Sequence, residues 1–190
     1  MGNKELLTRG HVQFTSAGTG ISHAEFNGDK TRGGKPVRFL QIWAVPEKRG
    51  LKPAYQTGFY SEEDKLDKLC PVLYPAANFT PTKGMGPLAI NNSLTMHASL
   101  LSPGAKVSLP LSKAHLAYIH VPIMPGSTGI SVASPGEKDA VLSPGEGCFV
   151  EGVEGPLTFT GLGEGKVSGG GVQEAASSAT TEFVVMHFLK

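Results

Sequence analysis

Turns containing the dipeptide Pro-Gly recur through the second half of the chain and divide it into short apolar stretches. They occur as SPG at residues 102–104, MPGS at 124–127, and SPGE at 134–137 and again at 143–146. Proline presets φ at the second position of a tight turn, and the glycine after it accepts left-handed backbone geometry. Many short strands joined by turns have this pattern, so we predict an all-β fold.

The predicted strands fall into two unequal sets. The strongest is VRFLQIWAV at residues 37–45, which is rich in β-branched and aromatic residues and is closed by Pro46. The second set suits a complete jelly-roll barrel, the cupin architecture, whereas the first supplies only about five strands. We predict strands at residues 5–9, 11–15, 22–26, 37–45 and 55–60, then at 94–101, 106–109, 114–122, 129–133, 139–142, 147–150, 157–160 and 181–188.

The segments between these strands predict the connections. Residues 61–68 are highly charged, which indicates a short helix or a linker turn, and residues 71–86 form an irregular connection between the halves. Residues 161–179, rich in Gly, Ser and Ala, predict a flexible surface loop before the last strand. Gly18 and Gly20 predict a tight turn that allows positive φ and a close backbone approach. We therefore divide the chain into two parts, residues 1–70 and residues 71–190.

Charge and composition exclude several classes of function. The formal net charge is +1 and no basic stripe is present, so direct nucleic-acid binding is not expected. No apolar run approaches the roughly 20 residues that span a bilayer, and the first residues lack the apolar core of a secretory signal. Cys70 and Cys148 lie far apart, which indicates free thiols in a reducing compartment. We expect a soluble intracellular protein, cytoplasmic or nuclear, without a membrane partner.

His23 and Glu25 are the residues whose spacing suggests chemistry. They stand at i and i+2 on a predicted strand, so both side chains point to one face. If that face lines a barrel, the pair is costly to bury unless it is paired or binds a cation. Nitrogen and carboxylate ligands suit Fe(II), Mn, Ni or Zn. The alternatives, that both face solvent or bond each other, stay open from spacing alone.

Other polar, aromatic and sulfur-bearing residues favour structural roles. Gln41, on the strongest strand, is a candidate for lining the same cavity, with a core amide or a solvent contact as the alternatives. Trp43 is expected in a core, and Cys148 in a buried, unreactive strand. His11 is expected at the surface. The remaining histidines show no cupin ligand spacing, so each is predicted to be satisfied or exposed; they are His97, His115, His120 and His187.

Several unusual pieces in order resemble one known family. They are GHVQ at residues 10–13, SAGTGISHAE at 16–25, LQIW at 40–43, PE at 46–47 and GLKPAYQ at 50–56. Over residues 4–59 the chain resembles the pirin family, and it is most similar to the branch with quercetin 2,3-dioxygenase-like activity. The resemblance is weaker toward the C-terminus. It implies a double β-barrel, or bicupin, with residues 1–70 as the C-terminal part of the first barrel and the second barrel in 71–190.

The pirin resemblance also implies a metal site that is only half present. Pirin-like proteins hold one metal, usually iron, with three histidines and one glutamate; His23 and Glu25 match the later two ligands. The earlier HPH-type pair has no counterpart, and MGNKEL resembles a segment internal to the family. We therefore expect an N-terminally truncated chain with an incomplete first barrel, or a natural short form. Two ligands hold a transition metal poorly compared with four.

Three functions follow from the resemblance. The first is Fe(II)-dependent ring opening of a flavonol such as quercetin with O₂, with Glu25 as ligand and base, impaired here by the absent ligands. The second is a nuclear cofactor that binds transcription factors. The third is a metal-free bicupin scaffold. Loss of covering strands would expose sheet edges, so we also expect poor solubility or a protein partner that supplies those strands.

Overall fold

The computed structural model describes residues 2–77, 86–163 and 180–189, in which almost all regular structure is β-strand. The single helix of this part, α1, has four residues. The elements are β1 (His11–Ser16), β2 (Ala54–Phe59), α1 (Glu62–Lys65), β3 (Cys70–Pro75), β4 (Leu88–Ile90), β5 (Thr95–Leu101), β6 (Lys106–Leu111), β7 (His115–His120), β8 (Ile130–Ala133), β9 (Ala140–Leu142), β10 (Gly147–Glu151), β11 (Gly155–Gly161) and β12 (Thr181–Leu189).

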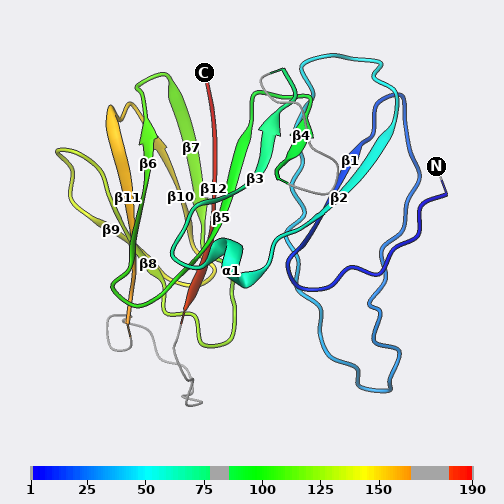
Figure 1. The fold of residues 1–190 in the computed structure, drawn as a ribbon, viewed down its shortest axis with the longest axis horizontal. Helices are drawn as coiled ribbons and strands as arrows, with labels where there is room; N and C mark the ends of the chain where they lie inside the picture. The colour runs from blue at the N-terminus through cyan, green and yellow to red at the C-terminus, as the bar shows by residue number, and fades with distance from the viewer. Residues whose placement is uncertain (1, 78–85, 164–179, 190) are drawn as a thin grey trace.

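Strands β3–β12 form two facing sheets, which we call the C-terminal barrel (Figure 1). One sheet has the order β10-β7-β12-β5-β3-β4, and the other has the order β6-β11-β8-β9. Every pairing in them is antiparallel except β3 with β4. Their facing side chains form the barrel core, in which Phe159 of β11 and Phe183 of β12 lie with ring centroids 4.7 Å apart. This arrangement confirms the all-β, cupin-type jelly roll predicted from the turn pattern.

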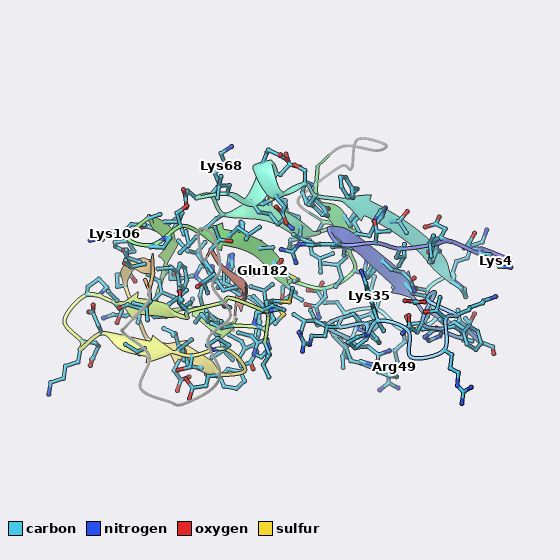
Figure 2. The ribbon with its side chains drawn as sticks, turned by 90° about the horizontal axis from the view of Figure 1, so that it is seen from below. Lys4, Lys35, Arg49, Lys68, Lys106 and Glu182 are labelled. Carbon is cyan, nitrogen blue, oxygen red and sulfur yellow. The ribbon has the colours of Figure 1, made fainter. Side chains whose placement is uncertain are left out.

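The six-stranded sheet is also covered on its other face. Met96 of β5 and Val184 of β12 form a second apolar cluster with Tyr60, against which Val12 and Phe14 of β1 pack. The strands β1 and β2 form a separate two-stranded sheet. The apolar contact of the N-terminal region, defined as residues 2–59, with the barrel is therefore made by side chains of this two-stranded sheet. Figure 2 shows Lys35 and Arg49 of this region on the opposite side of the molecule from Lys106 of the barrel.

Polar contacts fix the junction between the two parts. The hydroxyl of Tyr60 donates to the Val72 carbonyl at 3.1 Å, and burial raises the pKa of Tyr60 to about 12. Glu182 of β12 pairs with Arg9 at 3.1 Å and with Lys65 at 3.8 Å. Ser61 caps α1 through a reciprocal capping box with Asp64, which resolves residues 61–68 as a short helix followed by a turn.

Three predicted strands of the N-terminal region are absent. Residues 5–9, 22–26 and 37–45 have no regular structure, although the predictions at β1 and β2 are confirmed. A strand needs a hydrogen-bonded neighbour, and within the described residues β1 pairs only with β2. The segment 37–45 is held at its end, where the Asn92 side-chain amide donates to the Val45 carbonyl at 2.5 Å. High β-propensity alone did not create a sheet.

In the C-terminal barrel the prediction was wrong in the opposite direction. Residues 71–86 were expected to be an irregular connection, yet β3 covers Cys70–Pro75 and pairs with β4 and β5. Prolines normally argue against an interior strand, but the register of β3 shifts between Pro71 and Leu73, so the ladder accommodates the ring there. The other eight barrel strands lie close to their predicted positions. The surface loop expected at 161–179 falls mostly outside the described residues.

The glycine turn of the N-terminal region behaves as predicted. Gly18 and Gly20 both have positive φ, at 53° and 127°. A Cβ on Gly18 would lie 2.0 Å from the Leu51 carbonyl oxygen, which accepts a hydrogen bond from the Thr19 backbone at 3.0 Å. Only glycine allows this approach, so Gly18 ties the end of β1 to the residues that lead into β2.

Candidate functional site

His23 and Glu25 lie in solvent, on an irregular segment that follows the glycine turn. Both side chains are exposed, and neither makes an ion pair within the described residues. The expectation that they share the inner face of a barrel wall is therefore wrong for this structure. The physical reason is the absence of a paired strand at 22–26, because without a sheet there is no inner face for alternate side chains to share.

These two residues alone do not fit a resident metal ion. Within residues 2–77, 86–163 and 180–189, no group of three or more His, Cys, Asp or Glu side chains converges on one point. Metal affinity depends on the number of ligands and on partners that orient them. Two exposed side chains without such partners should bind a transition-metal ion only weakly.

The aromatic and amide candidates near this pair are also exposed. Trp43, expected in a core, has 88% of its surface accessible. Gln41 is exposed as well and lines neither cavity described below. In the described structure no second layer covers the segment 37–45, so its apolar side chains remain in water. Phe26, Phe39 and Val45 share this exposure.

Three histidines expected to be unrelated come together in the C-terminal barrel. His187 of β12 lies between the other two, with its ring centroid 5.7 Å from that of His97 and 5.5 Å from that of His115. The His97 and His187 rings are stacked, with an interplanar angle of 8°, and Tyr74 meets His97 edge-on at 6.0 Å. Only His120, of the four histidines considered in this half, lies apart from the cluster.

The environment of this cluster disfavours the charged form of His187 and His97. Burial, together with the neighbouring His97 and His115, lowers the pKa of His187 to about 4, and burial alone lowers the pKa of His97. His115 accepts a hydrogen bond at Nδ1 from the Ser112 backbone N–H at 3.1 Å. A backbone N–H can only donate, so Nδ1 of His115 is the acceptor and Nε2 carries the ring proton.

A cavity of about 300 Å³ opens beside these rings. Its walls include His115, His187, Tyr74, Ser93 and Thr95. These residues come from the starts of β5 and β7 and the end of β12, so the cavity lies at one end of the barrel. It contains aromatic faces, hydroxyls and imidazole nitrogens.

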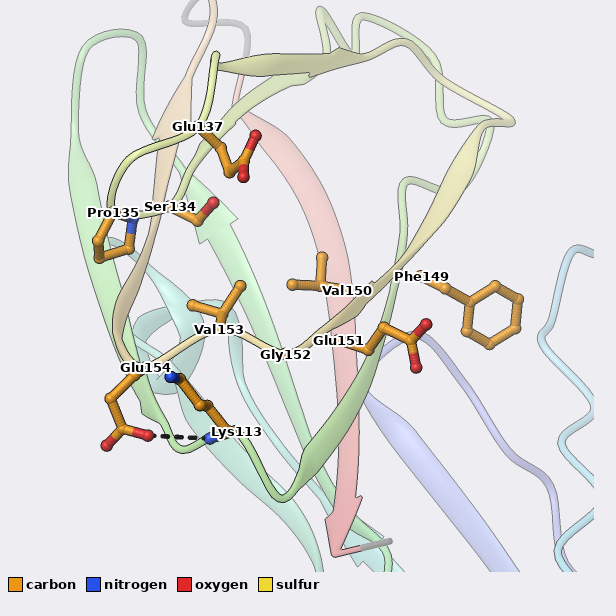
Figure 3. Close-up of a pocket in the computed structure, with 10 residues that line it drawn as sticks. All are labelled: Lys113, Ser134, Pro135, Glu137, Phe149, Val150, Glu151, Gly152, Val153 and Glu154. Carbon is orange, nitrogen blue, oxygen red and sulfur yellow. Dashed lines mark hydrogen bonds between the residues drawn. The ribbon is translucent and has the colours of Figure 1, made fainter.

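A larger, shallower cavity of about 520 Å³ lies elsewhere on the barrel (Figure 3). Glu154 accepts a hydrogen bond from the Lys113 backbone at 3.0 Å, and Phe149 points away from the opening. Its lining residues include Glu137, Val150 and Val153. The charged groups at this opening are spread around its rim and present no converging catalytic set.

The sequence contained one signal for the histidine cluster. Each of the three residues lies within a predicted strand. Each is also an even number of residues away from a core residue of that strand, so the two share a face. The missing information was strand order: His97 and His187 become neighbours only because β12 inserts between β5 and β7. A search for ligands close in sequence could not find residues brought together by that crossover.

The two cysteines are free, as predicted. Cys70 is buried and Cys148 is half-buried against the barrel core. Burial raises the pKa of both thiols, which keeps them protonated and weakly nucleophilic at neutral pH. In the part of the chain that the structure describes, no helix is long and apolar enough to cross a membrane.

Comparisons with known proteins agree with the sequence pattern. The pirin family model matches residues 1–44. A Mycobacterium tuberculosis protein with a provisional quercetin 2,3-dioxygenase name is 36% identical over 109 residues, which are 57% of this chain and 42% of that protein. Quercetin 2,3-dioxygenase of Escherichia coli K12 is 45% identical over 56 residues, 30% of this chain and 23% of that enzyme. The chain thus spans less than half the length of these relatives.

Solved structures confirm the fold. YhhW from Escherichia coli superposes with a TM-score of 0.71 at 20% identity, covering 99% of this chain and 64% of that one. A nickel(II) complex described as bacterial pirin YhhW gives a TM-score of 0.67 at 18% identity, with coverage of 99% and 65%. Identities this low show the fold alone.

Proposed function

We propose, since this chain is a pirin-family protein, that it is related to the quercetin 2,3-dioxygenases and retains two ligands of their metal site, His23 and Glu25. The observation that carries the proposal is position: both residues fall inside the 44 residues matched by the pirin model. In a complete site we assign both as metal ligands and Glu25 as the catalytic residue. Gln41 would line the substrate pocket.

The proposed activity of the whole protein is oxygen-dependent opening of a flavonol ring at Fe(II) or another divalent transition metal. A quercetin 2,3-dioxygenase name on relatives and a nickel(II) complex of a bacterial pirin support this choice. In the observed geometry the pair is exposed and lacks further ligands. We therefore propose weak metal binding and little or no turnover for the 190 residues by themselves.

The relation to the pirin family also suggests how the chain is divided into domains. We propose residues 1–70 as the C-terminal part of a first cupin barrel and residues 71–190 as the second barrel. The separate β1–β2 sheet and the two facing sheets built from β3–β12 support this boundary. It falls one residue inside β3, whose first residue is Cys70.

A metal titration of the purified chain tests the ligand assignment. Ni²⁺ binding to the 190-residue chain is measured by calorimetry, with His23→Asn, Glu25→Gln and the matched surface control Glu47→Gln. Removing one of two ligands should weaken binding at least about tenfold, and the control should leave it unchanged. Equal affinity in all four proteins would contradict the assignment. Quercetin-dependent oxygen uptake, measured after Fe(II) loading, should stay at the protein-free rate.

A protein-binding role is the alternative, and one observation favours it. The N-terminal region exposes more large apolar side chains than the surface of a monomeric soluble protein usually does. They are Phe26, Val37, Phe39, Leu40, Ile42, Trp43 and Val45. Such a surface fits a partner chain that supplies paired strands. Metal binding that depends on His23, without any partner, favours the first proposal over this one.

A further inference from the structure

The three clustered histidines point into the interior of the C-terminal barrel. Side chains two residues apart on a strand share a face. His97 therefore shares the face of Leu101 on β5, His187 that of Val185 on β12, and His115 that of Ile119 on β7. Leu101, Val185 and Ile119 all belong to the barrel core. The imidazoles continue the inner face of the sheet at the end where the apolar core stops.

Several polar atoms of this interior lack partners. Within the described residues, His97 Nδ1, His187 Nε2 and Ser99 Oγ are buried and make no hydrogen bond. His97 is 8% exposed and Ser99 is fully buried. Buried polar groups are nearly always paired, because each unpaired one costs about 1–3 kcal/mol. Of these three residues only His187 also lines the cavity, so a ligand bound there is placed to supply the missing partner of His187.

The cavity selects for an uncharged ligand. None of its lining residues is Asp, Glu, Lys or Arg, and burial together with the neighbouring histidines lowers the pKa of His187 to about 4. Burying an ion without a counter-charge is costly, so an anion or an ammonium group is disfavoured. A volume near 300 Å³ lies at the small end of ligand pockets. Tyr74 and His187 provide ring faces for a flat molecule.

We propose that this end of the C-terminal barrel binds a small uncharged phenol, whose ring packs against Tyr74 and His187 and whose hydroxyl bonds the unpaired His187 Nε2. A phenol hydroxyl both donates and accepts, so it can serve a neutral imidazole in either tautomer. The Nε2–H of His115 and the hydroxyls of Ser93 and Thr95 line the same space. The site uses neither His23 nor Glu25, so it is independent of the metal-site proposal and is tested separately.

A metal ion suits this cluster less well. The His97 and His187 rings are stacked face to face, and no group of three metal-binding side chains converges within the described residues. Stacked rings direct their nitrogens along parallel planes instead of toward one centre. A flat ligand can lie against such a ring without moving it.

Titration of the 190-residue chain with phenol, followed by amide NMR, tests the site. We expect saturable shifts at β5, β7 and β12 with a Kd on the order of 1 mM. Toluene, which keeps the ring and loses the hydroxyl, should bind at least about tenfold more weakly because the imidazole nitrogen stays unpaired. Benzoate and Zn²⁺ should cause no saturable shift at these strands. Tighter binding of toluene, benzoate or Zn²⁺ than of phenol would overturn the proposal.

Substitutions locate the binding residue. His187→Phe keeps a ring of similar size and should weaken phenol binding at least about tenfold, whereas His120→Phe, a histidine of β7 outside the cavity, should leave it unchanged. Retained amide dispersion shows that each variant folds. Thr95→Val is nearly isosteric and should weaken phenol binding about threefold. It serves as the second test variant if His187→Phe fails to fold. Unchanged affinity in the folded cavity variants would refute the assignment.

Discussion

The N-terminal region and the C-terminal barrel carry similar apolar side chains, but only the barrel buries them. Phe159 and Phe183 are 0% exposed between two sheets, whereas Phe39 is 64% exposed and Trp43 is 88% exposed. Both regions contain sequences of high β-propensity. The difference is that each barrel strand has a hydrogen-bonded neighbour and a facing layer, while residues 37–45 have neither in the described structure. Burial, not propensity, decides which apolar segments become a core.

Substitutions of one aromatic residue in each region test this comparison most directly. Phe159→Ala should lower the free energy of unfolding by about 3–5 kcal/mol, because it empties a fully packed site. Trp43→Ala should change it by less than about 0.5 kcal/mol, because an exposed side chain loses little on truncation. Urea unfolding monitored by far-UV circular dichroism measures both. A large loss for Trp43→Ala would show that the N-terminal region is covered in solution.

The turn chemistry and the barrel strands were predictable because they depend on local residues. Pro-Gly turns specify where strands end, and the alternation between them predicts which faces are apolar. Gly18 was identified for the same reason. The strand at 37–45 failed because its partner is not a local property, and β3 was missed because Pro71 and Pro75 suggested a connection. At the site, His23 and Glu25 were found by spacing, whereas the histidine cluster depends on strand order that no local pattern reveals.

Acid should affect the barrel more than the N-terminal region. His187 has a folded pKa of about 4, below its ordinary value of 6.5, so the unfolded state takes up a proton first as the pH falls. The free energy of unfolding should therefore be highest above pH 6.5 and decline between pH 6.5 and 4. His187→Gln should reduce that decline. Urea midpoints of both proteins at several pH values measure this decline, and an equal decline in His187→Gln would contradict the assignment.

The contact between the two regions should contribute the least. Arg9 reaches Glu182 of β12, but its side chain is 45% exposed, and solvent screens such pairs. Arg9→Met should lower the free energy of unfolding by no more than about 1 kcal/mol. Arg38→Met, an exposed arginine of the N-terminal region without an ion pair among the described residues, should have no effect. A loss of several kcal/mol for Arg9→Met would mean that the two regions unfold as one tightly coupled unit.

The central place of β12 has a kinetic consequence. This strand pairs with β5 on one side and β7 on the other, although about eighty residues separate it from β5 along the chain. Until Thr181–Leu189 arrives, the larger sheet is split into two incomplete halves with open edges. Closing it requires bringing distant segments together, which slows folding in proteins dominated by such contacts. During synthesis, those edges therefore stay open until β12, the last strand of the barrel in chain order, has left the ribosome.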